Sequence, residues 1–199
     1  MELVLASRNR KKAEEIRRIL AGHPVEVRSL ADFPDCPDVI EDADTFDGNA
    51  LKKAREIAEF TGQVAIADDS GLEVDALNGA PGVHSARYAG PDATDAANVE
   101  KLLSTLQSVP DGQRSARFVC CIAIAAPGGD SHTFWGFVEG SIGREPKGGL
   151  GFGYDPVFYP AGHVRTFAEM AASEKDSLSH RRKALGKLAD FLKNSEQYQ

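Results

Sequence analysis

Two adjacent carboxylates, Asp68 and Asp69, directly follow a short apolar run at residues 64–67. Carboxylates at the end of a buried strand lie where α/β sheets commonly bind ligands. Because successive side chains of a strand point to opposite faces, one of the two should face the ligand unless a turn begins between them. Such a carboxylate can hold Mg²⁺ or orient a water molecule. An acidic Asp-Ser-Gly turn without chemistry fits the same residues equally well.

A basic segment at residues 7–12 separates an apolar, strand-like run from a helical pattern. The backbone N–H groups at a helix N-terminus attract anions, whereas basic side chains there oppose the helix dipole. The segment is therefore typical either of a phosphate site or of a solvated basic helix start. The sequence contains neither GxxxxGK[ST] nor GxGxxG, so a Walker phosphate loop and a Rossmann dinucleotide site have no support.

Two loops could supply further contacts to a ligand. Glu41 lies just before an expected helix, where it could be a second metal ligand or simply a charge that favours the helix dipole. In the segment 151–156, Phe152 stands between two glycines and could stack on a planar ligand. Asp155 could accept hydrogen bonds from ring or exocyclic N–H groups. A glycine-rich turn with core aromatics explains the same segment.

The start of the last expected helix carries three side chains that donate hydrogen bonds, Lys175, His180 and Arg181. Lys175 could bind a phosphate, and His180 and Arg181 could donate to carbonyl oxygens. A polar helix start with surface cations is the alternative. The five histidines are scattered without the spacing of a zinc site.

The order of apolar patterns predicts an α/β protein with a mixed β-sheet flanked by helices. We expect one helix after residue 9, one at about 45–60, one that opens at 92–95 and one at about 177–193. The expected strands are at 3–6, 25–27, 64–67, 72–74, 116–126, 132–142 and 157–159, with a turn at 68–71.

The composition is that of an acidic globular protein. There are 23 Lys and Arg against 30 Asp and Glu, and the net charge of −7 argues against a broad cationic surface for nucleic acid. A small anionic ligand in a local basic pocket stays compatible with this charge. No run approaches the roughly 20 apolar residues of a membrane span, and the N-terminus lacks the features of a secretory signal. The three cysteines are expected to be reduced, which favours a cytoplasmic location.

Taken in order, the motifs resemble one family, the inosine triphosphate pyrophosphatases, also called Ham1-like dITP/XTP pyrophosphatases. The resemblance extends over most of the chain, from Leu3 to about Leu192. Five or more motifs in the same order are highly specific, although none is so alone. The matching segments are 6–12, Glu41 with 45–46 and 49–54, 67–72, 79–88, 151–156 and 174–181.

The resemblance implies a fold and an activity. The implied fold is an elongated mixed sheet flanked by helices, with two lobes and a central active-site cleft, in a single domain over residues 1–199 without a linker. The implied activity is Mg²⁺-dependent hydrolysis of ITP, dITP and XTP to the monophosphate and pyrophosphate, which keeps deaminated purines out of DNA and RNA. The expected assembly is a homodimer.

The resemblance gives Asp69 the central role, as proton acceptor for the attacking water and, together with Glu41, as a ligand of Mg²⁺. Asp68 is expected to be a supporting carboxylate. One residue departs from the family pattern, since many members have Gly where this chain has Ala43. The expected substrate contacts are Ser7, Arg8, Asn9, Arg10, Lys11, Lys12, Lys53 and Ser70, and on the nucleoside side Phe152, Gly153, Tyr154, Asp155, Lys175, His180 and Arg181.

Base choice is expected to depend on hydrogen bonds. A 6-keto purine offers an acceptor to His180 or Arg181, whereas adenine would leave these donors unpaired at a cost of about 1–3 kcal/mol per group. Three alternatives differ from this reading: a nucleotide-binding regulator that does not turn over, a pyrophosphatase with a broader substrate range, and a single-stranded nucleic-acid binder. The last needs a basic track with interleaved aromatics, and no such track is visible in the sequence.

Overall fold

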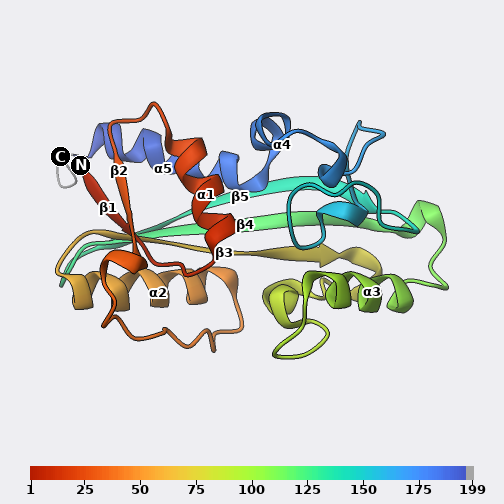
Figure 1. The fold of residues 1–199 in the computed structure, drawn as a ribbon, viewed down its shortest axis with the longest axis horizontal. Coiled ribbons are helices and arrows are strands. Elements are labelled where there is room, and N and C mark those ends of the chain that lie inside the picture. The colour runs from red at the N-terminus through yellow and green to blue at the C-terminus, as the bar shows by residue number, and fades with distance from the viewer. Residues whose placement is uncertain (196–199) are drawn as a thin grey trace. The chain divides into compact units, whose positions relative to one another are not determined.

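A mixed six-stranded β-sheet with helices on both faces organises the computed structural model, which describes residues 1–195 (Figure 1). The strand order is β2-β1-β3-β4-β5-β6. Strand β1 is parallel to β2 and β3, and β6 is antiparallel to β5. The strands are β1 (Glu2–Leu5), β2 (Glu26–Ser29), β3 (Ala65–Val74), β4 (Ser115–Ala125), β5 (Ser131–Ile142) and β6 (Phe158–Pro160). The helices are α1 (Arg10–Leu20), α2 (Phe46–Thr61), α3 (Asp95–Thr105), α4 (Ala172–Leu178) and α5 (His180–Asn194). The predicted α/β class and mixed sheet are confirmed.

The chain divides into two compact units. The first comprises Met1–Asp69, Cys120–Gly136 and Arg181–Gln199, and the second comprises Ser70–Val119 and Phe137–His180. A single domain over residues 1–199 stays a prediction, as does its central cleft, and residues 196–199 lie outside the described part of the chain. No helix among residues 1–195 is both long enough and apolar enough to span a bilayer.

In the first unit, α1 and α5 cover one face of the sheet and α2 covers the other (Figure 1). Each helix buries the apolar stripe that the sequence predicts at a spacing of three to four residues. Two caps fix where helices begin: Asn9 accepts a hydrogen bond from the Lys12 amide, and Thr45 accepts one from the Gly48 amide. Lys12 therefore lies in the first turns of α1, whereas Lys53 lies further along α2.

The second unit has its own core, in which α3 packs on the parts of β3, β4 and β5 that belong to this unit. Thr94 caps α3 by accepting a hydrogen bond from the Ala97 amide. Val99, Leu102 and Leu106 are buried as predicted, and Leu103 is only half-buried. The ring of Phe118 lies 4.6 Å from that of Phe158 at the centre of this core.

Two local predictions are wrong. The expected turn at 68–71 does not form, because β3 continues as one strand from Ala65 to Val74. The turn propensity of Asp, Ser and Gly is outweighed by the cations that pair with the two carboxylates, and tertiary partners commonly override local propensity in strands. The expected helix at 177–193 is interrupted at Ser179, whose extended backbone (φ −67°, ψ 151°) separates α4 from α5.

Candidate active site

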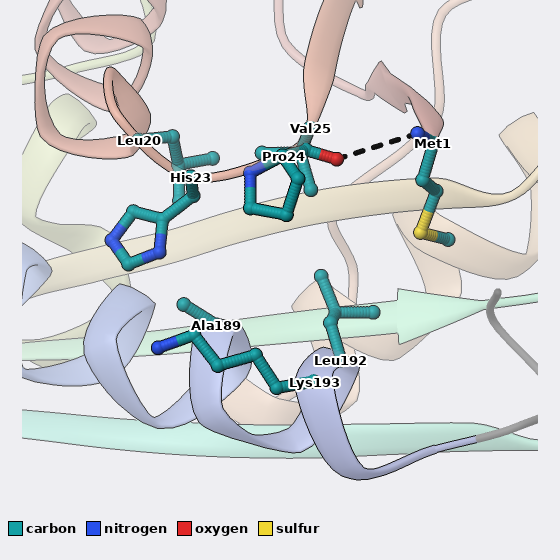
Figure 2. A pocket seen from close by; sticks show the side chains of 8 residues that line it. All are labelled: Met1, Leu20, His23, Pro24, Val25, Ala189, Leu192 and Lys193. Atoms are coloured by element: carbon teal, nitrogen blue, oxygen red, sulfur yellow. Dashed lines mark hydrogen bonds between the residues drawn. The ribbon is translucent and has the colours of Figure 1, made fainter.

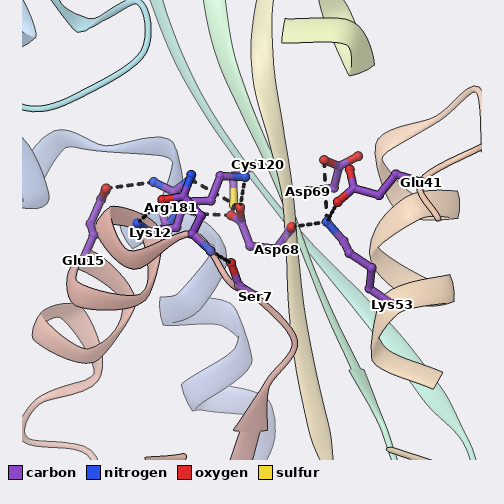
Figure 3. A network of polar contacts seen from close by, with 10 residues as sticks. Ser7, Lys12, Glu15, Glu41, Lys53, Asp68, Asp69, Cys120 and Arg181 are labelled. Atoms are coloured by element: carbon purple, nitrogen blue, oxygen red, sulfur yellow. Dashed lines mark hydrogen bonds and ion pairs between the residues drawn. The ribbon is translucent and has the colours of Figure 1, made fainter. Parts of the chain in front are cut away.

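Strand β3 directs Asp68 and Asp69 to its two opposite sides (Figure 3). Asp68 points towards α1 and α5, whereas Asp69 points towards α2 (Figure 3). The two residues are almost equally buried, with exposures of 2% and 5%. The alternation predicted from the sequence therefore holds, and both carboxylates lie inside the protein in separate polar clusters.

Asp68 lies at the centre of an ionic network. Its Oδ1 is 2.7 Å from Lys12 Nζ, and its Oδ2 accepts from Arg181 Nε at 3.0 Å. The Cys120 thiol donates to the same Oδ2 at 3.1 Å. Arg181 is tied down a second time, because its Nη1 donates to Glu15 Oε2 at 2.9 Å. We call this set, Asp68 with Lys12, Arg181, Glu15 and Cys120, the Asp68 network.

The network decides the charge of Asp68. Burial alone would raise the pKa of Asp68, but the Arg181 guanidinium and the Lys12 ammonium outweigh burial and hold the pKa well below its ordinary value. Burial likewise opposes the charged form of Lys12, and the Asp68 carboxylate outweighs it, so the pKa of Lys12 is raised. Asp68 is thus a fixed anion that cannot accept a proton near neutral pH.

Asp69 belongs to a second cluster, formed with Glu41 and Lys53. The Lys53 ammonium donates to Glu41 Oε1 at 2.8 Å and lies 4.0 Å from Asp69 Oδ1. It also donates to the Asp68 main-chain carbonyl at 2.8 Å, which anchors it beside β3. One cation therefore lies between two carboxylates, Asp69 of β3 and Glu41. Glu41 belongs to the loop at residues 33–45, which we call the acidic loop.

This setting makes Asp69 a basic carboxylate. Burial raises its pKa to about 6, Lys53 and Lys12 work against that rise, and Glu41 and Asp68 add to it. A general base is most effective when its pKa lies near the working pH. Asp69 can therefore gain and lose a proton near neutrality, whereas Asp68 stays charged.

The residues around Lys53 fit a magnesium site. Among residues 1–195, no three His, Cys, Asp or Glu side chains converge in the manner of a complete metal site. Mg²⁺ is usually held by one or two carboxylates, with water and substrate phosphate oxygens supplying the remaining ligands. Glu41 and Asp69 already share one cation, and both offer the hard oxygen ligands that Mg²⁺ prefers. The donor set thus suits Mg²⁺ bound together with a phosphate.

The basic segment 7–12 contains residues with different partners. Ser7 Oγ accepts from the Asn9 amide at 3.2 Å, which orders the approach to α1. Arg8 donates to Asp38 at 2.5 Å and to the Cys36 carbonyl, so it connects this segment to the acidic loop. Arg10 pairs with Glu14 one turn along α1, and Lys11 is exposed. Phosphate contacts by this segment stay a prediction.

In the second unit, the loop at 151–155 is folded around Asp155. Its Oδ2 accepts from the Phe152 amide at 2.9 Å and from Lys175 Nζ at 2.5 Å. The same ammonium lies 4.8 Å from the centroid of the Phe152 ring, over its face. Gly151 is required here, because it has φ +76° and a Cβ atom would lie 2.1 Å from Asp155 Oδ2. The structure brings Phe152, Asp155 and Lys175 together, and their contact with a nucleoside stays a prediction.

The remaining predicted nucleoside contacts have separate surroundings. His180 is buried and stacks on Phe118, with ring centroids 4.9 Å apart and planes at 10°. Tyr154 is buried, and its hydroxyl donates to the Ser85 carbonyl. Arg181, expected beside the base, is instead held by the Asp68 network. A direct contact between Arg181 and the base stays a prediction, as does the substrate contact of Ser70, which is half-buried in β3.

Sequence reasoning missed Glu15 and Cys120. Glu15 is 3% exposed, and its place next to Ile16 on the buried face of α1 was a usable signal, because a charge on an apolar stripe needs a buried partner. Cys120 gave no such signal, because a buried cysteine in a strand is ordinarily a small apolar residue. Only the fold brings its thiol to Asp68.

The departure at Ala43 has no structural cost that we can identify. The Ala43 amide donates to Asn49 Oδ1 at 3.0 Å, and Asn49 Nδ2 donates back to the Ala43 carbonyl at 3.2 Å. Among the described residues, Asn78 is the one non-glycine with positive φ, so the Ala43 backbone does not require glycine. Asn49 of α2 therefore anchors the acidic loop that carries Glu41.

The first unit also contains a cavity of about 240 Å³ near the N-terminus (Figure 2). It is lined mainly by apolar side chains from the N-terminus, the end of α1, the turn that follows and α5, and the Met1 amine donates to the Pro24 carbonyl beside it. None of the predicted site residues lines this cavity, so we assign it no part in the chemistry.

Comparisons with known proteins agree with the geometry. A model described as the Ham1 family matches residues 3–191. The chain is 54% identical over 192 residues to the dITP/XTP pyrophosphatase of Desulforamulus reducens, covering 96% of each chain, and 53% identical over 190 residues to that of Geobacter sulfurreducens, again covering 96% of each. A solved HAM1 protein from Coxiella burnetii superimposes with a TM-score of 0.89 at 44% identity, covering 98% of this chain and all of that one.

Proposed function

This chain belongs to the Ham1 family, and we propose that it hydrolyses dITP, XTP and ITP to the monophosphate and pyrophosphate. The observation that carries the proposal is the Asp69 cluster, in which a buried carboxylate with a pKa of about 6 lies beside Glu41 and Lys53. Hydrolysis of a triphosphate needs a proton acceptor for water and cations for the phosphates, and this cluster offers both.

In the proposed reaction, Asp69 accepts the proton of the attacking water. Lys12 and Lys53 neutralise phosphate charge, and the N-terminal amides of α1 add a favourable dipole. Asp68 holds the Lys12 ammonium at 2.7 Å and so positions it without exchanging protons itself. Mg²⁺ held by Glu41 and Asp69 would supply the additional positive charge that makes phosphorus accessible to water.

The loop at 151–155 would receive the purine. Phe152 offers an aromatic face, and Asp155 and Lys175 fix that face through two hydrogen bonds and one cation–π contact. His180 would donate to a 6-keto oxygen, which hypoxanthine and xanthine have and adenine lacks. The product would be removed from the nucleotide pool before polymerases use it. We further expect a homodimer located in the cytoplasm.

Pyrophosphate release with Mg²⁺ tests the proposal, with dITP, XTP, ITP, GTP and ATP as substrates. We expect kcat/KM for the deaminated purines to exceed that for ATP by at least about tenfold, the effect of one unpaired buried donor. Comparable values for all five would instead support a pyrophosphatase of broad range. Tight nucleotide binding without pyrophosphate release would support a regulator that does not turn over.

A further inference from the structure

Helix α3 is joined to the loop at 151–155 by a hydrogen bond. Asp95, the first residue of α3, accepts a hydrogen bond from the Gly153 amide at 2.9 Å through its Oδ2. Gly153 has φ +61°, a left-handed backbone conformation at which the chain changes direction between Phe152 and Asp155. The Asp95 carboxylate therefore fixes the orientation of the peptide in the middle of the loop.

The same helix holds the neighbouring segment at 86–89. Asn98 is buried, and it donates to the Ala86 carbonyl at 3.1 Å while accepting from the Ala89 amide at 2.7 Å. Ser85, the residue before this segment, is connected in turn to the 151–155 loop, because the Tyr154 hydroxyl donates to the Ser85 carbonyl at 2.8 Å. Hydrogen bonds therefore link helix α3, residues 85–89 and the loop to one another within the second unit.

An open pocket of about 420 Å³ lies between α3 and the loop, lined by Val99 and Leu103 of α3 and by Gly153 and Pro156 of the loop side. Asp95 and Gly153 both line this pocket. The hydrogen bond between them therefore joins helix and loop at a place where their apolar side chains leave a gap.

We propose that Asp95 is a positioning residue for nucleoside binding, which acts by holding the Gly153 peptide and through it the Phe152 ring. This inference rests on the proposed function, because it takes the 151–155 loop as the purine site. Asp95 touches no reacting atom in this account. Its loss should weaken substrate binding and leave the chemical step, which belongs to Asp69, nearly unchanged.

Three variants separate this role from helix stability. Asp95→Ala removes the acceptor, Asp95→Asn keeps an amide oxygen that can accept from Gly153 but removes the charge, and Thr94→Ala removes only the helix cap. For dITP we expect Asp95→Ala to raise KM by roughly threefold to tenfold, the loss of about one hydrogen bond, with kcat within about twofold. Asp95→Asn and Thr94→Ala should stay within about twofold of the wild-type KM on the same reasoning.

An unchanged KM in Asp95→Ala, or an equal rise in Thr94→Ala, would overturn the proposal. Hydrogen exchange at the Gly153 amide gives a second readout that does not depend on activity. We expect it to be protected in the wild type and in Asp95→Asn, and faster in Asp95→Ala. If the wild-type protein released no pyrophosphate, the proposed function would fail, and the exchange result would still show whether Asp95 holds the loop; wild-type protection retained in Asp95→Ala would show that it does not.

Discussion

Asp68 and Asp69 are neighbours in one strand and are equally buried, yet their protonation behaviour is opposite. Asp68 is surrounded by Lys12, Arg181 and the Cys120 thiol, and its pKa is held well below the ordinary range. Asp69 shares a single close cation, Lys53, with a second carboxylate, Glu41, and burial raises its pKa to about 6. Burial therefore does not assign the role of a carboxylate here; the number and distance of its cations do.

The difference gives the two sides of β3 different electrostatic surroundings. The Asp68 network joins α1, β3, β4 and α5 of the first unit, and it fixes the direction of Lys12. The Asp69 cluster has one cation fewer, and the Glu41 side chain remains 35% exposed. An additional cation and a phosphate can thus be attracted on the Asp69 side, whereas the Asp68 charge is already compensated.

The largest effect is expected when the Asp68 network loses its anion. Asp68→Asn leaves Arg181 and Lys12 facing a neutral amide in the interior, so we expect the free energy of unfolding at pH 7 to fall by about 3–5 kcal/mol. Because the folded pKa of Asp68 is lowered, its stabilising contribution is present above the unfolded pKa near 4 and fades as the pH falls below it. Urea unfolding at pH 7 and at pH 3 measures both expectations.

A companion variant distinguishes lost pairing from general disruption. If the cost arises from uncompensated cations, adding Arg181→Met to Asp68→Asn should recover part of it, because one buried charge then disappears. A further loss of stability in the double variant would mean that Arg181 contributes through packing and Glu15 alone. The contrast between the two carboxylates would then lose its electrostatic basis.

We expect Asp69→Asn to raise the free energy of unfolding, whereas Asp68→Asn lowers it. The rise in pKa from 3.8 to about 6 corresponds to roughly 3 kcal/mol of stability that the wild type loses as Asp69 ionises. Because the folded pKa is raised, that stability is fully present below the unfolded pKa near 4 and is lost as the pH rises through about 6. We expect Asp69→Asn to be more stable than wild type by about 1–3 kcal/mol at pH 8 and equal to it at pH 4, in urea titrations with chelator present.

A destabilised Asp69→Asn at pH 8 would contradict this assignment. It would mean that the carboxylate is favourably paired with Lys53 in the folded protein, as Asp68 is with its own cations. The two carboxylates would then differ in position only.

A smaller effect is expected at the adjacent cysteines, which form a matched pair. Both are buried and outside any disulfide, and of the two thiols it is that of Cys120 that donates to Asp68 Oδ2, at 3.1 Å. Cys120→Ala and Cys121→Ala remove the same atoms, so their difference isolates that bond, and we expect Cys120→Ala to be less stable by roughly 0.5–1.5 kcal/mol. Equal losses in thermal unfolding would remove Cys120 from the Asp68 network.

Local patterns predicted much of the fold and of the site composition. The approximate helix positions and the Asp pair after an apolar run depend on residues close in sequence. The prediction of a turn at 68–71 was wrong because the structure of this segment depends on residues that are distant in sequence. The cations that keep these aspartates in a strand come from Lys12, Lys53 and Arg181, which lie up to 113 residues away.

The different protonation of the two aspartates could not be predicted from their local sequence. Both have the same side chain and follow the same apolar run at residues 64–67, and nothing close in sequence supplies either with a cation. What distinguishes them is the arrival of Arg181 and Cys120 on one side and of Glu41 on the other. The family resemblance names Asp69 as the proton acceptor, and that role stays a prediction with which its raised pKa is consistent.

The rate of pyrophosphate release from dITP by Asp69→Asn, measured together with its stability at pH 8, tests the central claim most directly. The account predicts that kcat falls by at least about 10²-fold, the usual contribution of a general base, while the free energy of unfolding stays at or above that of the wild type. An Asp69→Asn protein that is folded and releases pyrophosphate at close to the wild-type rate would contradict it.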